Sequence, residues 1–284
     1  MLCVENVTKC FGTFTALEDI SIRFSPGIYG LLAPNGAGKT TLMKMLATLL
    51  FPTRGQILWE GEEILSLGED YRGVLGYLPQ SFGCYPGSTA RGFLSYAAAL
   101  QKIPKSQVSD RVDELLALVG LSEQAEKKLR QFSGGMLQRV GIATAMIHDP
   151  KLLILDEPTA GLDPKERVRF RNLIHSLSKD RIVILSTHIV SDIETVAGQI
   201  VMIADHTLRC CDTPSAICRS FSGRIYQQPS SLPLPAGARL LSEVHGEEGA
   251  QLRFFCERPL EKELLVTPSL EDAFLATYLE EEKR

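Results

Sequence analysis

Residues 33–41 read Ala33-Pro34-Asn35-Gly36-Ala37-Gly38-Lys39-Thr40-Thr41 and stand between a short apolar strand over 28–32 and a helical run over 42–50. A glycine-rich turn that opens a helix directs successive backbone N–H groups at phosphate oxygens, and the helix dipole favours the same negative charge. Lys39 would reach the outer phosphates as a point charge, and the Thr40 hydroxyl would bind Mg²⁺. The competing interpretation is a strand–helix turn with an incidental lysine.

The predicted nucleotide contacts of this loop come from Asn35, Gly36, Ala37, Gly38, Lys39, Thr40 and Thr41. Ala33 departs from the usual pattern G-x-x-x-x-G-K-[ST], whose first position is glycine. Alanine is compatible with that position if its φ is negative. We therefore interpret residues 33–41 as a tolerated variant of a phosphate-binding loop.

Two acids, Asp156 and Glu157, follow the apolar run Leu152-Leu153-Ile154-Leu155. Carboxylates at the end of a buried strand are costly unless they have a partner, and a bound Mg²⁺–nucleotide supplies one. Asp156 would hold the metal through water, and Glu157 would act as general base on the attacking water. The alternative is a strand that ends in a solvated acidic turn.

Strands and helices alternate over much of the chain. The expected elements are strands over 152–155, 182–186 and 200–203 and helices over 165–177 and 189–196. Strands separated by helices predict βαβ units and a mostly parallel sheet. A helical block at about 88–147 interrupts the alternation, which indicates a helical subdomain inserted into the sheet domain.

The composition shifts near Ser222, after which residues 227–235 are rich in Gln, Pro and Ser and predict an extended loop. Residues 240–244 and 251–256 favour strands, and residues 269–278 favour a helix with Ser269 as a possible N-cap. We expect a small α+β accessory domain over 223–284, with a solvated end at 280–284.

Five further motifs stand in order along the chain. They are Lys9-Cys10-Phe11-Gly12, Gly76-Tyr77-Leu78-Pro79-Gln80, Phe132-Ser133-Gly134-Gly135-Met136-Leu137-Gln138-Arg139, Pro158-Thr159-Ala160-Gly161-Leu162-Asp163 and Leu185-Ser186-Thr187-His188. With the phosphate loop and the acidic strand, this ordered set resembles the nucleotide-binding domain of the ATP-binding cassette (ABC) superfamily over about residues 1–220. The resemblance implies an α/β fold, a P-loop NTPase of ABC type with a mixed sheet, an inserted helical subdomain and a small C-terminal domain.

The resemblance also implies a role for each motif. Phe11 would stack on adenine, and Gln80 of the glutamine loop would serve both catalysis and Mg²⁺ binding. His188 would be the switch histidine that supports hydrolysis beside Glu157. The remaining nucleotide contacts would come from Ser133, Gly134 and Gly135 of the signature loop and from Asp163 of the D-loop.

Each of these residues has a simpler interpretation. Phe11 could be a core aromatic at a strand edge, and Gln80 an ordinary polar loop residue. His188 could cap the junction between a strand and a helix. Ser133 could N-cap the helix that follows it, a role that is compatible with anion binding at the same place.

The implied mechanism needs two copies, because in this fold the signature loop lies far from the phosphate loop of its own chain. ATP on Lys39 of one copy would be capped by Ser133 and Gly135 of a second copy, or of a homologous ATPase subunit, in a head-to-tail dimer. ATP and Mg²⁺ are the expected ligands. Closure of the dimer would then be an ATP-dependent population shift.

The resemblance implies an ATP-hydrolysing subunit that powers a separate integral membrane permease. Met136 stands where most family members have glutamine, as in the branch that resembles drug, antibiotic and polysaccharide exporters, so we expect export. The permease would dock on residues 81–91, with Phe82, Tyr85 and Phe93 as apolar contacts. The alternatives are a non-transport ABC ATPase that acts on ribosomes or DNA, and a regulatory module without turnover.

The composition of the chain indicates its cellular location and the partners it is not suited to bind. The 284 residues carry a net charge of −4, which provides no basic footprint for nucleic acid. No apolar run is long enough to span a membrane, and the N-terminus lacks the pattern of a secretory signal. Seven cysteines without a CxxC spacing favour a reducing compartment. We expect a cytoplasmic protein held at the inner face of the cell membrane by its permease.

Overall fold

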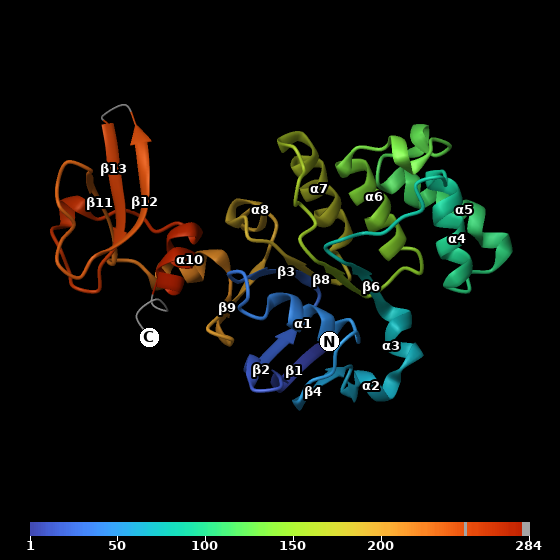
Figure 1. The fold of residues 1–284 in the computed structure, drawn as a ribbon, viewed down its shortest axis with the longest axis horizontal. Helices are drawn as coiled ribbons and strands as arrows, with labels where there is room; N and C mark the ends of the chain where they lie inside the picture. Colours follow the sequence, from blue (N-terminus) through green and yellow to red (C-terminus); the bar gives the residue numbers. More distant parts are fainter. Residues whose placement is uncertain (247–248, 280–284) are drawn as a thin grey trace.

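The computed structural model describes residues 1–246 and 249–279 (Figure 1). Its centre is a six-stranded sheet in the order β10-β9-β3-β8-β7-β6. The strands are β3 (Gly27–Leu32), β6 (Leu75–Leu78), β7 (Leu152–Leu155), β8 (Ile182–Ser186), β9 (Gln199–Ala204) and β10 (Thr207–Asp212). Five of them pair in parallel and β10 pairs antiparallel to β9, so the predicted α/β fold with a mixed sheet is confirmed.

A second, antiparallel sheet covers one side of this core. It comprises β1 (Leu2–Phe11), β2 (Phe14–Phe24), β4 (Arg54–Trp59) and β5 (Glu62–Glu63), in the order β2-β1-β4-β5. Helix α1 (Lys39–Leu46) lies between the two sheets, and Leu42, Met43 and Leu46 are fully buried there. The helix that begins at the predicted phosphate loop is therefore fixed from both sides.

Helices fill the long connection between β6 and β7. The helices are α4 (Ala90–Leu100), α5 (Lys105–Leu118) and α6 (Gly134–Ala145), and all lie within the range 88–147 expected for a helical subdomain. Two short helices, α2 (Ile64–Leu67) and α3 (Glu69–Val74), precede β6. Thr89 and Ser133 N-cap α4 and α6 through their side-chain oxygens, which explains where these two helices begin.

Three helices connect the remaining strands of the central sheet. They are α7 (Pro164–Leu177), α8 (Val190–Glu194) and α9 (Pro214–Ser220). Both α7 and α9 begin at a capping side chain followed by proline, Asp163-Pro164 and Thr213-Pro214. No helix in the described ranges is long and apolar enough to cross a bilayer.

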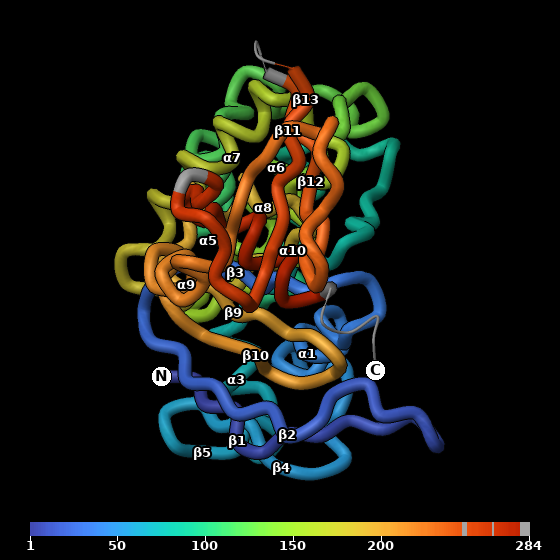
Figure 2. The backbone as a smooth tube through the Cα atoms, turned by 90° about the vertical axis from the view of Figure 1, so that its left-hand side faces the viewer, coloured from blue at the N-terminus to red at the C-terminus, as the bar shows by residue number. Residues whose placement is uncertain are grey.

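The C-terminal residues form a separate three-stranded sheet in the order β11-β13-β12. The strands are β11 (Ile225–Pro229), β12 (Arg239–Gly246) and β13 (Gly249–Phe255), and helix α10 (Leu270–Leu279) follows. Figure 2 shows these strands at the top of the view and the β1-β2-β4-β5 sheet at the bottom. The solvated end expected at 280–284 lies outside the described residues.

The loop predicted for residues 227–235 is wrong in its first part, because β11 runs through Pro229. Ile225 and Tyr226 are buried at its start, and the strand pairs antiparallel with β13 as far as Pro229. A polar Gln-Gln-Pro segment has little strand propensity of its own. Pairing with β13, which lies more than twenty residues further along, outweighs that local preference.

Candidate nucleotide-binding site

The backbone of the phosphate loop depends on two glycines. Gly36 and Gly38 have φ values of +87° and +100°, in the region that residues with a side chain rarely adopt. A Cβ at Gly38 would also come within 2.4 Å of the carbonyl oxygen of Ala16. Ala33 is fully buried and does not have a positive φ, so the condition for alanine at this position is met.

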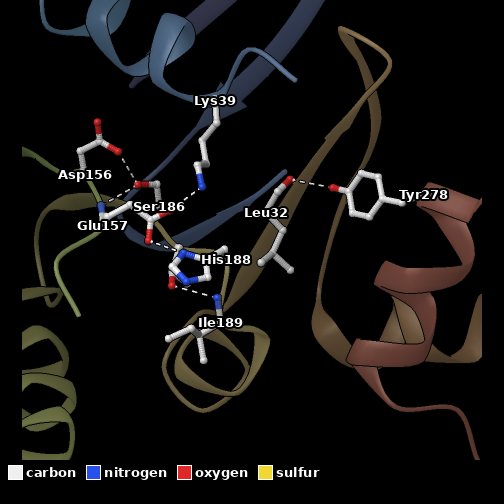
Figure 3. A network of polar contacts seen from close by, with 9 residues as sticks. Leu32, Lys39, Asp156, Glu157, Ser186, His188, Ile189 and Tyr278 are labelled. Carbon is white, nitrogen blue, oxygen red and sulfur yellow. Dashed lines mark hydrogen bonds and ion pairs between the residues drawn. The ribbon is translucent and has the colours of Figure 1, made fainter. Parts of the chain in front are cut away.

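Lys39, the first residue of α1, is buried and paired with an acid from a different strand. Its Nζ lies 2.6 Å from Oε1 of Glu157, and both side chains are only 7% exposed (Figure 3). Buried charges persist only when they are paired, so this contact fixes both side chains at one point. The loop and the acidic strand, predicted separately, meet here.

Ser186, at the end of β8, joins the two acids that follow β7. Its Oγ donates a hydrogen bond to Oδ1 of Asp156 at 2.7 Å and accepts one from the backbone N–H of Glu157 at 2.8 Å (Figure 3). Ser186 is fully buried, and Glu157 has a φ of +48° that turns the chain sharply after the strand. One hydroxyl therefore sets the positions of the proposed metal ligand and the proposed base.

The sequence interpretation assigned no role to Ser186. The available signal was a hydroxyl residue at the end of the apolar strand 182–185, in the adjacent parallel strand to the acidic one. The carboxyl ends of neighbouring parallel strands meet at one edge of a sheet, which is where ligands bind in such folds. That argument places Ser186 beside Asp156 once β7 and β8 are known to be neighbours.

His188 turns toward Glu157, and its Nδ1 lies 3.0 Å from Oε2 of that carboxylate. Its side chain is 59% exposed, so the opposite side of the ring faces solvent. At the junction before α8, the backbone N–H of Ile189 donates to Oγ1 of Thr187, and no side chain caps the helix. The alternative interpretation of His188 as a cap of this junction is therefore not supported.

Asp156 is 1% exposed, and within the described part of the chain no basic side chain forms an ion pair with it. Burial raises the pKa of nearby Tyr77 to about 12, and the negative charge of Asp156 acts in the same direction, so Tyr77 remains a neutral phenol. A buried carboxylate without a cationic partner fits a divalent cation. The described residues hold no cluster of three or more His, Cys, Asp or Glu side chains suited to a metal, so such an ion would also need other oxygen ligands.

Other residues named from the sequence lie apart from this network. Phe11 ends β1 with 47% of its surface exposed and Nζ of Lys9 5.0 Å from its ring centroid, so it is not a core aromatic. Asn35 and Gln80 are exposed, and Thr40 and Thr41 are half-buried. Among the described residues, no hydrogen bond joins Gln80 or Thr40 to Asp156.

The signature loop and the D-loop form a second cluster. Ser133 accepts a hydrogen bond from the backbone N–H of Met136, and Asp163 accepts one from that of Glu166, so both residues are helix N-caps. Ser133, Gly134 and Asp163 are exposed, whereas Gly135 is buried. A Cβ at Gly135 would lie 3.0 Å from Cγ of Glu166.

Glu166 ties the two helices of this cluster together. Its carboxylate lies 3.3 Å from Nε of Arg139 in α6 and 2.7 Å from Nη1 of Arg169 in α7. In the described ranges, no hydrogen bond joins this cluster to the Lys39 network. Within the described residues, these are thus two separate hydrogen-bond networks.

Ser186→Ala should lower ATP turnover about tenfold, because removal of a residue that orients a metal ligand typically costs that much. The substitution removes the hydroxyl that holds both Asp156 and the backbone of Glu157. Steady-state phosphate release measures the effect. Ser176→Ala, which loses a serine hydroxyl bonded to Leu173 of α7, is the matched control. Wild-type turnover in Ser186→Ala would contradict the role given to Ser186.

A glycine-rich loop that opens a buried helix, beside a strand that ends in paired acids, defines a P-loop nucleotide-binding protein. The sequence profile described as ABC transporter matches residues 17–160. The chain belongs to the ABC transporter family.

Two relatives illustrate the match. The chain is 41% identical over 204 residues to the uncharacterized ABC transporter ATP-binding protein YxlF of Bacillus subtilis (strain 168), which covers 72% of this chain and 68% of the relative. It is 40% identical over 206 residues to the bacitracin transport ATP-binding protein BcrA of Bacillus licheniformis, covering 72% of this chain and 66% of that protein. The matched region spans about two thirds of the length of these relatives.

A solved structure of the ATP-binding subunit of an ABC transporter superposes with a TM-score of 0.70 and 28% identity, covering 78% of this chain and 93% of that one. These relationships confirm the predicted fold and the assignment as an ATP-binding ATPase subunit of the ABC class. They do not favour the alternative of an ATPase that acts on ribosomes.

Proposed function

We propose that this chain hydrolyses ATP with its Lys39–Glu157–His188 network and transmits the resulting conformational change to a membrane permease. The observation that carries the proposal is the convergence of these side chains from the start of α1 and from just after β7 and β8. Lys39 lies 2.6 Å from one oxygen of Glu157, and His188 lies 3.0 Å from the other. In this assignment the backbone of residues 35–41 holds the phosphates of ATP. When ATP binds, Lys39 would exchange the carboxylate of Glu157 for the outer phosphates. Carboxylate and phosphate oxygens both accept charge-assisted hydrogen bonds from its ammonium group.

Glu157 then acts as general base on the attacking water, and His188 holds the second oxygen of its carboxylate. The strained turn at Glu157 and its backbone bond to Ser186 keep the side chain directed at the phosphate loop. Asp156, Thr40 and Gln80 would hold Mg²⁺, which would supply positive charge against the charge that develops on the phosphates. Phe11, exposed at the edge of β1, is available to stack on adenine.

We propose that the Lys39 network and the cluster of the signature loop and the D-loop are two half-sites that meet in a head-to-tail dimer, because no described hydrogen bond joins them within one chain. The exposed Ser133 and Gly134 stand at the N-terminus of α6, which is a favourable place for an anion. The Arg139–Glu166 contact joins this helix to the D-loop helix, so both would approach the ATP of a second copy as one unit. ATP would thus be part of the interface, and its hydrolysis would open the dimer.

For the permease, we propose a contact surface on the helical subdomain. Tyr85 and Tyr96 are 59% and 48% exposed, and their rings are 5.8 Å apart. Phe82 is half-buried against the core, and Phe93 is only 7% exposed, so Phe93 supports the surface from beneath. Exposed aromatic side chains of this kind are typical of protein interfaces.

We propose that the direction of transport is export. Two observations support this direction: Met136 in the signature loop, and the similarity to a bacitracin transport subunit. The protein would then lie at the cytoplasmic face of the membrane through its permease.

Tyr85→Glu should reduce recovery of a permease about tenfold, since a central aromatic contact commonly carries that share of binding. The measurement is a pull-down from detergent-solubilised native membranes with ATP, read by mass spectrometry. The Tyr85→Glu variant should keep the ATPase activity of the unaltered chain when it is assayed in solution without a permease. Leu232→Glu, which changes an exposed apolar residue next to the C-terminal sheet, is the control. Equal recovery with both variants would contradict this surface, and recovery of no membrane protein with the unaltered chain would contradict the transport role.

A further inference from the structure

Helix α10 belongs to two hydrophobic cores. Leu270 and Ala273 are fully buried in the core that also contains Met202 of β9. Ala276, less than one turn further along, is buried instead with Phe255 of the C-terminal sheet. The helix therefore bridges the C-terminal sheet and the central sheet, as its position between them in Figure 1 shows.

A buried ion pair fastens α10 to the C-terminal sheet. Nε and Nη2 of Arg253 in β13 each donate to one oxygen of Asp272 at 2.6 Å, and Asp272 is 4% exposed. Asp272 and Ser269 also cap the start of the helix through reciprocal hydrogen bonds. Burial alone would raise the pKa of Asp272, but its hydrogen bonds to Arg253 and Ser269 outweigh burial and lower the pKa below its ordinary value.

The far end of α10 reaches the base of the phosphate loop, at the end of β3. Oη of Tyr278 lies 3.3 Å from the carbonyl oxygen of Leu32 (Figure 3). It also lies 3.1 Å from the carbonyl oxygen of Ile203, so both contacts are close to the carboxyl ends of β3 and β9. The hydroxyl has a single proton, so it donates to one of these carbonyls at a time. Leu32 and Ile203 are fully buried, so the phenol bonds polar groups that lie away from water.

Leu32 is the residue immediately before Ala33, where the phosphate loop begins. The direction in which β3 ends determines where the N–H groups of residues 35–41 point. An edge-to-face contact between Phe274 and Tyr278, with ring centroids 4.3 Å apart, orients the phenol. Contacts therefore run without a gap from Arg253 of the C-terminal sheet, through α10, to the base of the loop.

We propose that Tyr278 is a positioning residue of the ATP site, through which the C-terminal segment sets the affinity for ATP. The proposal rests on the proposed assignment of residues 33–41 as the phosphate loop. The described hydrogen bonds of Tyr278 go to backbone carbonyls at the base of the loop, so its hydroxyl acts on ATP binding and not on the chemical step.

Tyr278→Phe tests this role, because it removes the hydroxyl and keeps the ring that packs on Phe274. The Kd for Mg–ATP and the KM of ATP hydrolysis should each rise about three- to tenfold, the range expected for one lost hydrogen bond. kcat at saturating ATP should stay within about twofold of the unaltered chain. A residue that only stabilised the fold would not separate KM from kcat in this way.

Tyr226→Phe is the matched control. It removes a buried tyrosine hydroxyl of the C-terminal segment that donates to the carbonyl of Gly223 and accepts from the backbone N–H of Leu260, both within that segment. Its Kd for Mg–ATP should match that of the unaltered chain. Unchanged affinity in Tyr278→Phe, or an equal loss in both tyrosine variants, would overturn the proposal.

Lys39→Ala in the same binding assay separates the two levels of the argument. If Lys39→Ala binds Mg–ATP like the unaltered chain, the phosphate loop itself has been misassigned. If Lys39→Ala loses ATP while Tyr278→Phe does not, the loop assignment stands and the role of Tyr278 is wrong.

Discussion

Glu157→Gln should bind ATP and hydrolyse it at least about 100-fold more slowly than the unaltered chain, because loss of a general base commonly costs that much. Glutamine keeps the size of the side chain but cannot take a proton from water. The carboxylate it replaces is 7% exposed and lies between Nζ of Lys39 and Nδ1 of His188. The substitution therefore changes the chemistry at this point with little change of shape.

The same variant should not lose affinity for ATP. Glu157 is the acid that holds Lys39, so its neutralisation releases the buried cation for the phosphates. Equilibrium binding of ATP and single-turnover phosphate release measure the two effects separately. Glu60→Gln, which neutralises an exposed carboxylate paired with the N-terminus, is the control for charge. Turnover near that of the unaltered chain in Glu157→Gln would place the base elsewhere.

The parts of the site that sequence alone predicted are those that depend on local geometry. A glycine-rich turn between a strand and a helix has few uses, and both Gly36 and Gly38 adopt the positive φ that the loop requires. Likewise, two acids after an apolar strand need a partner. Lys39 and Glu157 are 118 residues apart in the sequence, yet both could be assigned to one site. Parallel strands bring their carboxyl ends to one edge of the sheet, where ligands bind.

Features that depend on long-range pairing were not predictable in the same way. A buried serine at a strand end gives no signal until the neighbouring strand is known, which is why Ser186 was missed. Strand β11 is set by its partner β13 and not by its own residues. The helix at 269–278 was expected from its apolar face, but a helical pattern does not reveal that the face contacts two different cores.

Lys39→Ala should reduce the affinity for ATP at least about tenfold, the lower range for loss of a charged hydrogen-bond donor. It should also destabilise the chain, because Glu157 would remain buried without its cation, and breaking a buried pair from one side typically costs about 3–5 kcal/mol. Loss of binding in this variant alone could therefore reflect partial unfolding.

The double variant Lys39→Ala/Glu157→Gln resolves these two effects. With both charges removed, no unpaired buried carboxylate remains, so the free energy of unfolding in urea should recover most of what Lys39→Ala loses. The affinity for ATP should stay low, because no cation is left at the start of α1 to meet the outer phosphates. A double variant that regains both stability and ATP binding would show that Lys39 serves only to pair with Glu157, and the phosphate-loop assignment would then be wrong.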